Sequence, residues 1–259
     1  MRYRWGEASP WSLQVGRTDS YKIGPFAYNY GDVFDGVQLS YQADSLTAAA
    51  GYGKFKKGNY MDGVKAAYGS VEIPWGGGRL AHSAIGAYYD DFTRAGSEYV
   101  QGNFDNSRFY ADDLWGVYTQ LHLTSKWEFL LNYEKIDTTG PVWKYGAAKA
   151  VDDPAVWLAR LRYGRADNQR PHSWDLWLEY MDADNGAYIS GMTASPSGIW
   201  RLGAQVDNLR SWGIGFDYAL AKGTTFSLMQ SFGTHTKDWQ SGNGQAEQEM
   251  TRAEFVFTF

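Results

Sequence analysis

The sequence predicts an all-β fold, a transmembrane antiparallel up-and-down β-barrel of about 12 strands in a single domain over residues 1–259. Three observations predict it. Apolar and polar residues alternate along many short segments, and these segments are joined alternately by short and long connections. Aromatic residues make up 17% of the chain, yet its mean hydropathy is only −0.49. A barrel whose apolar side chains face lipid and whose polar side chains face the lumen reconciles a polar average with an apolar outer face.

The last nine residues show the alternation most clearly. Phe255, Phe257 and Phe259 fall on one face of an extended strand, and Arg252 and Glu254 fall on the other, because side chains alternate with period two along a strand. Three phenylalanines on one face need an apolar environment, which lipid provides at the outer wall of a barrel. This segment is therefore predicted to be the final strand.

The other strands are predicted from the same alternation test. Their outward apolar sets span 11–15, 37–41, 46–52, 64–68, 81–89, 115–123, 127–133, 157–163, 174–180, 212–220 and 226–232. Residues 1–10 are the least certain part, because Arg2-Tyr3-Arg4-Trp5 alternates like a strand but would make the total odd. We expect this segment to be either a stub or a strand at the seam of the barrel.

The connections alternate between short and long. The short ones are 43–45, 75–78, 124–126, 165–171 and 221–223, and the long ones are 18–35, 55–62, 91–113, 137–154, 182–209 and 233–249. Short turns on one side and long loops on the other are typical of an outer-membrane barrel, whose short turns face the periplasm. The longest loops, 91–113 and 182–209, are the candidates for folding into the lumen.

Several other classes of protein fit the sequence less well. A soluble sandwich or propeller is the alternative fold, but no blade-length repeat is present. The absence of cysteine excludes disulfides, thiolate metal sites and cysteine nucleophiles. A net charge of −5 argues against a nucleic-acid partner. No His-Glu-x-x-His or Gly-x-Ser-x-Gly motif occurs, so we expect no enzyme, no cofactor and no metal site, with a membrane hydrolase kept as an alternative.

If the aromatic sets face lipid, the charged positions between them face the lumen. The predicted pore-lining residues are Glu128, Glu134, Arg160, Arg162, Asp175, Glu179, Asp217, Lys65, Arg252 and Glu254. Their charges alternate in sign across adjacent strands. One interpretation is cross-strand ion pairing that stabilises the wall. The other is a water-filled constriction whose charges select which solutes pass. Both can hold together.

A family resemblance supports the second interpretation. The segment Trp212–Thr225 resembles the penultimate hairpin of general porins, and 35–41 and 174–180 add to the likeness. It is most similar to the barrel of outer-membrane porins that carry an S-layer-homology domain in diderm Firmicutes. The resemblance implies a passive diffusion channel, usually trimeric, with an N-terminal module that grips a peptidoglycan-linked polymer. These 259 residues show no such module and a barrel a few strands shorter, so tethering is not carried over and trimer and pore width stay open.

The expected function is therefore an outer-membrane porin that passes ions and small hydrophilic solutes through a charged lumen. The expected location is the bacterial outer membrane, and the expected partners are its lipid, the solutes, and two further copies in a homotrimer. An alternative is a narrow or plugged barrel that acts as a structural or adhesive surface protein. Twelve strands give a backbone radius of roughly 12 Å, which is small enough to keep that alternative open.

Overall fold

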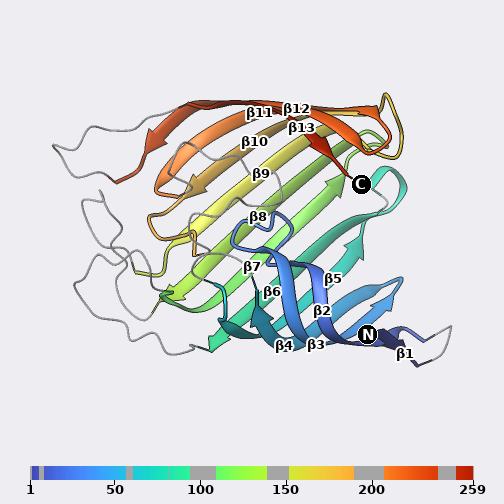
Figure 1. Ribbon diagram of the computed structural model, residues 1–259, viewed down its shortest axis with the longest axis vertical. Coiled ribbons are helices and arrows are strands. Elements are labelled where there is room, and N and C mark those ends of the chain that lie inside the picture. The colour runs from blue at the N-terminus through green and yellow to red at the C-terminus, as the bar shows by residue number, and fades with distance from the viewer. Residues whose placement is uncertain are drawn as a thin grey trace.

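The computed structural model describes residues 2–5, 9–56, 61–80, 82–93, 109–138, 152–189, 207–238 and 249–258. These residues form one 13-stranded sheet in which each strand pairs antiparallel with the next along the chain (Figure 1). The strands are β1 (Arg2–Arg4), β2 (Trp11–Lys22), β3 (Gly31–Ala43), β4 (Leu46–Phe55), β5 (Lys65–Trp75), β6 (Ser83–Thr93), β7 (Ala111–His122), β8 (Trp127–Thr138), β9 (Ala155–Gly164), β10 (Trp174–Ala183), β11 (Leu209–Ala221), β12 (Thr224–Thr236) and β13 (Thr251–Phe257). A 3-10 turn, η1 (Gly78–Leu80), precedes β6. The up-and-down order confirms the predicted fold class.

The strand count exceeds the prediction by one because the uncertain N-terminal segment is a strand. β1 pairs with β2 through Tyr3 opposite Leu13, and the other strands match the predicted ones. β1 and β13 are the edges of the sheet, and in the described ranges they are not hydrogen-bonded to each other. Phe259, part of the predicted last strand, lies outside the described residues. In the described part of the chain, no helix is long and apolar enough to cross a membrane.

The outer face of the sheet carries two belts of aromatic rings. Trp127, Trp157, Trp174 and Trp212 are each followed six residues later by a tyrosine on the same face, a spacing of about 20 Å along a strand. In the belt near the short turns, the ring centroids of Trp127 and Tyr163 are 4.9 Å apart. In the belt near the long loops, Tyr133 and Trp157 are 4.7 Å apart, as are Tyr180 and Trp212. Such paired belts are characteristic of the two membrane–water interfaces of a barrel.

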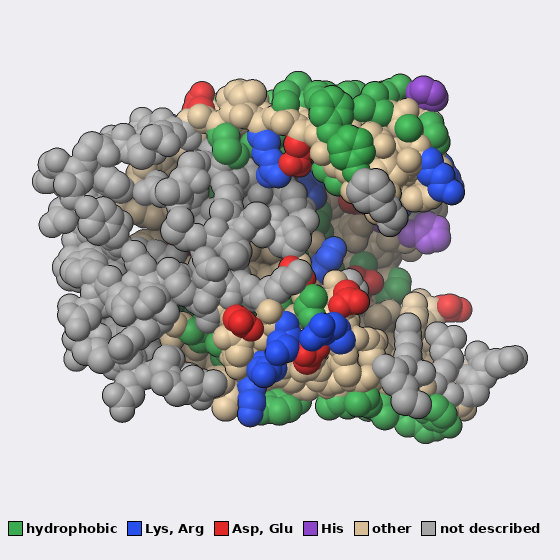
Figure 2. All heavy atoms as spheres, viewed as in Figure 1, with side chains coloured by type: hydrophobic (Ala, Val, Ile, Leu, Met, Phe, Trp, Pro, Cys, Tyr) green, Lys and Arg blue, Asp and Glu red, His purple; other side chains and the backbone are tan. Residues whose placement is uncertain are grey.

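Aliphatic side chains fill the band between the belts. Val117, Leu176, Ile214 and Leu228 are each more than a third exposed, which in a soluble protein would leave a large apolar surface in water. Figure 2 shows hydrophobic side chains along the upper and lower outlines of the molecule, with charged side chains around the hollow between them. The exposed apolar band is therefore the surface that meets lipid.

The inside of the curled sheet is filled at the long-loop end. Segment 23–30, between β2 and β3, turns inward and lies in front of β7 and β8 in Figure 1, and its Phe26 and Tyr28 are buried. Segment 184–189, after β10, is buried beside it. Of the two candidate loops, 182–209 folds inward in its described part 184–189, whereas the central residues of loop 91–113, from 94 to 108, lie outside the described residues. Inward folding of 23–30 was not predicted.

The register predicted for β5 was wrong by one residue. Val64 and Ala66 were expected to face outward, but both are buried with Phe55 and Met61 beneath the inward segments. Lys65, predicted to line the pore, is exposed and shares the outer face with Val71, Ile73 and Trp75. The physical reason is that the lipid-facing part of this strand is its second half. Its first residues lie at the long-loop end, where the inner side is the apolar one.

Candidate functional site

The inner face of β8, β9 and β10 carries two cross-strand ion pairs. Glu128 lies opposite Arg162, and Arg160 lies opposite Glu179. The Arg162 Nη2 to Glu128 Oε1 distance is 2.8 Å, and the Arg160 Nη2 to Glu179 Oε2 distance is 2.5 Å. Opposite charges placed directly across an antiparallel pair stabilise the sheet. The structure therefore brings these four predicted residues together as two ion pairs on the inner face.

Arg160 also connects the wall to the inward segment. Its guanidinium carbon lies 5.0 Å from the ring centroid of Phe26 and 5.8 Å from that of Trp177. A guanidinium at this distance from an aromatic ring is attracted by the electrons of the ring face. Arg160 thus contacts segment 23–30 through Phe26 while its charge is paired with Glu179.

Glu134, on the inner face of β8, is the main polar anchor of the inward segment. Its Oε1 accepts hydrogen bonds from the Tyr88 hydroxyl and from Asn132 Nδ2, both at 2.8 Å, and its Oε2 accepts one from Asn29 Nδ2 at 2.8 Å. Three donors around two oxygens suit a carboxylate, which can only accept. Asn29 Oδ1 in turn accepts from the backbone N–H of Ile189 at 2.9 Å. Asn29 therefore joins both inward segments to the wall.

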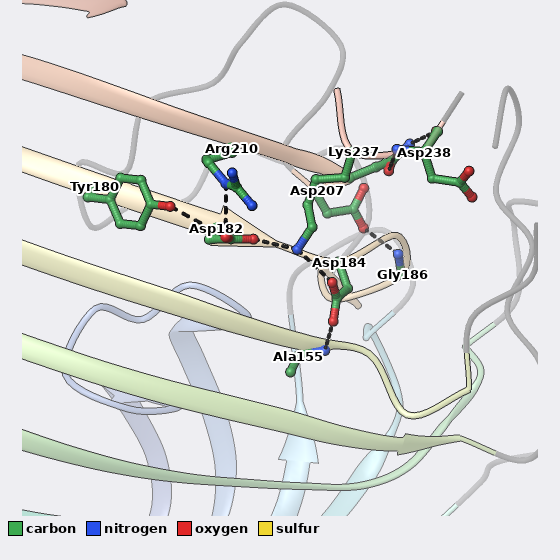
Figure 3. Close-up of polar contacts among 10 residues, drawn as sticks. Ala155, Tyr180, Asp182, Asp184, Gly186, Asp207, Arg210, Lys237 and Asp238 are labelled. Atoms are coloured by element: carbon green, nitrogen blue, oxygen red, sulfur yellow. Dashed lines mark hydrogen bonds and ion pairs between the residues drawn. The ribbon is translucent and has the colours of Figure 1, made fainter. Parts of the chain in front are cut away.

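A cluster of charged side chains at the long-loop end positions segment 184–189 (Figure 3). Lys237, just after β12, contacts both Asp182 and Asp184, and Asp184 Oδ2 accepts the backbone N–H of Ala155 at 3.0 Å. Asp207 Oδ2 accepts the backbone N–H of Gly186 at 3.1 Å. Burial lowers the pKa of Lys237, but its hydrogen bonds to the two aspartates more than offset this and raise the pKa above its usual value. The ammonium therefore stays charged.

Four other predicted residues lie on the inner face of the last strands. Asp175 and Asp217 are direct cross-strand partners near the short turns, and Arg252 contacts Glu254 on β13, with 2.5 Å between Nη2 and Oε2. Lys65 is the predicted residue that lies on the other side of the sheet. Asn29 was missed by sequence reasoning, because an asparagine in a connection is typical of any turn.

Glycines on the inner face receive aromatic rings from the neighbouring strand. Gly116 lies opposite Tyr88, and Gly86 lies opposite Tyr118. A Cβ at Gly116 would lie 2.2 Å from the Tyr88 ring, and one at Gly86 would lie 2.3 Å from the Tyr118 ring. The same relation holds for Gly51 with Tyr68 and for Gly215 with Trp177. Because each ring lies flat over a glycine, its polar tip reaches a lumen group on another strand.

The inner face offers solutes charged and hydrogen-bonding groups. In the described ranges, no group of three or more His, Cys, Asp or Glu side chains could hold a metal ion. Asp175, Asp217, Arg165, Asp167 and Arg170 line a cavity at the short-turn end. The arrangement can exert an electric field on passing solutes and exchange hydrogen bonds with them.

Comparison with solved structures finds a similar fold in outer-membrane porins of Pseudomonas aeruginosa. The chain matches OpdQ of Pseudomonas aeruginosa at 16% identity and a TM-score of 0.52, covering 96% of this chain and 67% of that one. It matches OccK3 (OpdO) of the same organism at 14% and 0.51, covering 97% and 66%. It also matches OccK2 (OpdF), solved in complex with glucuronate, at 17% and 0.51, covering 86% and 61%.

The chain thus spans about two thirds of the length of these structures, or somewhat less. At these identities the likeness shows the fold, an antiparallel porin β-barrel. No protein-family profile matches the chain, and no curated protein matches it.

Proposed function

We propose that this chain forms an outer-membrane porin through which ions and small hydrophilic solutes diffuse passively. The observation that carries the proposal is the separation of the two faces of the sheet. Tryptophan and leucine side chains cover the outer face, while Glu128, Arg160, Arg162 and Glu179 lie on the inner one. Charges on the inner wall of a lipid-facing barrel are stable only where they are paired or hydrated. The Arg160 and Arg162 side chains are 21% and 25% exposed, which supports a hydrated path beside them.

The proposal includes the bacterial outer membrane as location, its lipid as the surrounding partner, and a non-enzymatic role. The fold of the porins it resembles supports all three. A homotrimer and a kinship with S-layer-homology porins remain proposals drawn from the sequence alone, since the solved structures reported above belong to another porin group.

A second candidate function is favoured by the buried inward segments. Ile23, Phe26, Tyr28 and Ile189 pack in the long-loop half of the interior and narrow any path there. A barrel that these segments keep closed would serve as a structural or adhesive surface protein rather than as a channel. The two functions differ in conductance.

Planar-bilayer recording separates them. Protein folded in detergent and added to a bilayer in KCl should give discrete, uniform conductance steps, because each inserted barrel adds one hydrated path. The same protein denatured by boiling in detergent is the control and should give none. A sample whose strand content and heat-shifted gel mobility show a folded barrel, but which inserts without steps, would support the plugged alternative and refute the porin.

A further inference from the structure

Acidic side chains outnumber basic ones on the inner face of β2 to β13. The acidic residues there are Asp32, Glu72, Asp90, Glu128, Glu134, Asp175, Glu179, Asp217 and Glu254, and the basic residues are Arg160, Arg162 and Arg252. The three arginines contact Glu179, Glu128 and Glu254 respectively. The guanidinium charges are thus matched by three of the carboxylates, and the other carboxylates depend on different partners.

Those partners include neutral donors. The Tyr118 hydroxyl donates to Glu72 Oε2 at 2.6 Å, and the Tyr21 hydroxyl donates to Asp90 Oδ1 at 2.5 Å. Glu134 receives its three bonds from asparagine and tyrosine. A neutral donor satisfies a carboxylate oxygen but leaves the negative charge in place. The inner face of β2 to β13 therefore has more carboxyl groups than its three arginines can pair with.

Two of these carboxyl groups face each other at the short-turn end, between β10 and β11. Asp175 and Asp217 lie directly opposite each other. Asp217 accepts from Trp177 Nε1 at 3.0 Å and from the Ser227 hydroxyl at 2.5 Å, and Asp175 Oδ2 accepts from the backbone N–H of Ala166 at 2.9 Å. None of these donors carries a charge, and like charges in direct register repel.

The second carboxyl oxygen of Asp175, Oδ1, is in a different position. The residue is only 6% exposed, and within the described part of the chain no donor bonds its buried Oδ1, which is a costly state for a carboxylate oxygen. The cavity that both aspartates line also contains Arg165, Asp167 and Arg170. Arg170 contacts Asp167 at 3.3 Å, so among the residues lining this cavity Arg165 is the cation that remains against the two facing aspartates.

We propose that the lumen is cation-selective, and that Asp175 and Asp217 set this preference where the channel opens at the short turns. The solute class is inorganic cations and small organic ammonium or guanidinium compounds. Fixed carboxylates beside a narrow aqueous path raise the local concentration of cations and oppose the entry of anions. The inference rests on the proposed porin function and adds the sign of charge that it favours.

The test is the reversal potential of single channels under a KCl gradient. The single-channel current of the wild-type protein should reverse at a potential shifted from zero toward the potassium equilibrium potential. The double variant D175N/D217N keeps the size of both side chains, and its reversal potential should lie markedly closer to zero. The chain offers a matched control in Asp91 and Asp113, a cross-strand aspartate pair on the outer face. D91N/D113N removes the same charge and should reverse near the wild-type value, because exposed charges farther than a Debye length of about 10 Å at 0.1 M salt are screened.

The outcomes separate the two claims. Steps that reverse at zero or on the chloride side overturn cation selectivity and leave the porin function standing. Potassium-side reversal that D175N/D217N and D91N/D113N change equally overturns the role of Asp175 and Asp217. A folded protein without any steps overturns both claims. If the double variant does not fold, the wild-type reversal potential still decides the selectivity, and the single variants D175N and D217N decide the residues.

Discussion

The variant E134Q is expected to show a higher time-averaged conductance than the wild-type protein, because it releases segment 23–30 from the wall. Glutamine keeps one acceptor oxygen but presents an amide donor in place of the other. With the oxygen toward Tyr88 and Asn132, the new amide meets the Asn29 amide, donor against donor. Turned the other way, the new amide meets two donors, the Tyr88 hydroxyl and the Asn132 amide, so this orientation is less favourable. The favoured orientation therefore loses the bond from Asn29, which is the bond that joins segment 23–30 to Glu134.

The size of the effect follows from the bond that is lost. A hydrogen bond to a charged group contributes about 1.5–3 kcal/mol. A change of this size alters the ratio of docked to undocked segment by roughly tenfold to a hundredfold. Segment 184–189 loses the same connection to the wall, because the backbone N–H of Ile189 donates to Asn29 Oδ1. The measurement is single-channel recording, with mean current and open fraction compared at one voltage.

The reciprocal change provides the control. N29D alone places a second carboxylate against Glu134 and should also undock the segment. N29D combined with E134Q reverses the polarity of the bond, since the introduced glutamine amide can donate to the introduced aspartate carboxylate while the Ile189 N–H still donates to the other aspartate oxygen. The double variant has the net charge of the wild-type protein and should recover its conductance. If the change in conductance of the double variant equals the sum of the changes in the two single variants, this contact does not hold the segment.

Replacing Gly116 with valine is expected to destabilise the barrel strongly. A Cβ there would lie 2.2–2.3 Å from the ring and hydroxyl of Tyr88, so the ring must move. Tyr88 is buried and its hydroxyl bonds Glu134, which leaves little room for movement. Overpacking of this kind costs about 1–3 kcal/mol. The measurement is urea unfolding in lipid vesicles, followed by tryptophan fluorescence.

Gly69 is the matched control for Gly116. It lies on the outer face of β5, and the nearest atom to its Cβ position is the Ala49 carbonyl oxygen at 3.9 Å. G69V places an apolar, strand-favouring side chain toward lipid and should be neutral or slightly stabilising. Equal losses in the two variants would mean that glycine is needed for backbone reasons alone, and would contradict the packing of Tyr88 over Gly116.

Much of the wall could be predicted from the sequence, because a strand encodes both of its faces locally. Trp127 and Tyr133, or Arg160 and Arg162, are assigned to a face by parity alone. Lys65 was assigned to the wrong face because alternation shows which residues share a face but not which face meets lipid. Near the long loops the apolar face of β5 is the inner one. The contact between Asn29 and Glu134 could not be predicted, since it joins residues 105 positions apart through a loop whose composition is typical of any turn.

The most direct test of the two-faced wall is spin-label accessibility along β3. The chain has no cysteine, so single cysteines at residues 37–42 can each be labelled with a nitroxide in vesicles. Val37, Leu39 and Tyr41 should collide most with oxygen, which concentrates in lipid, whereas Gln38, Ser40 and Gln42 should collide most with a water-soluble nickel chelate. This result would place the aromatic and aliphatic face in the membrane and the polar face toward water. Accessibility without a period of two, or nickel contact at Val37 and Leu39, would contradict it.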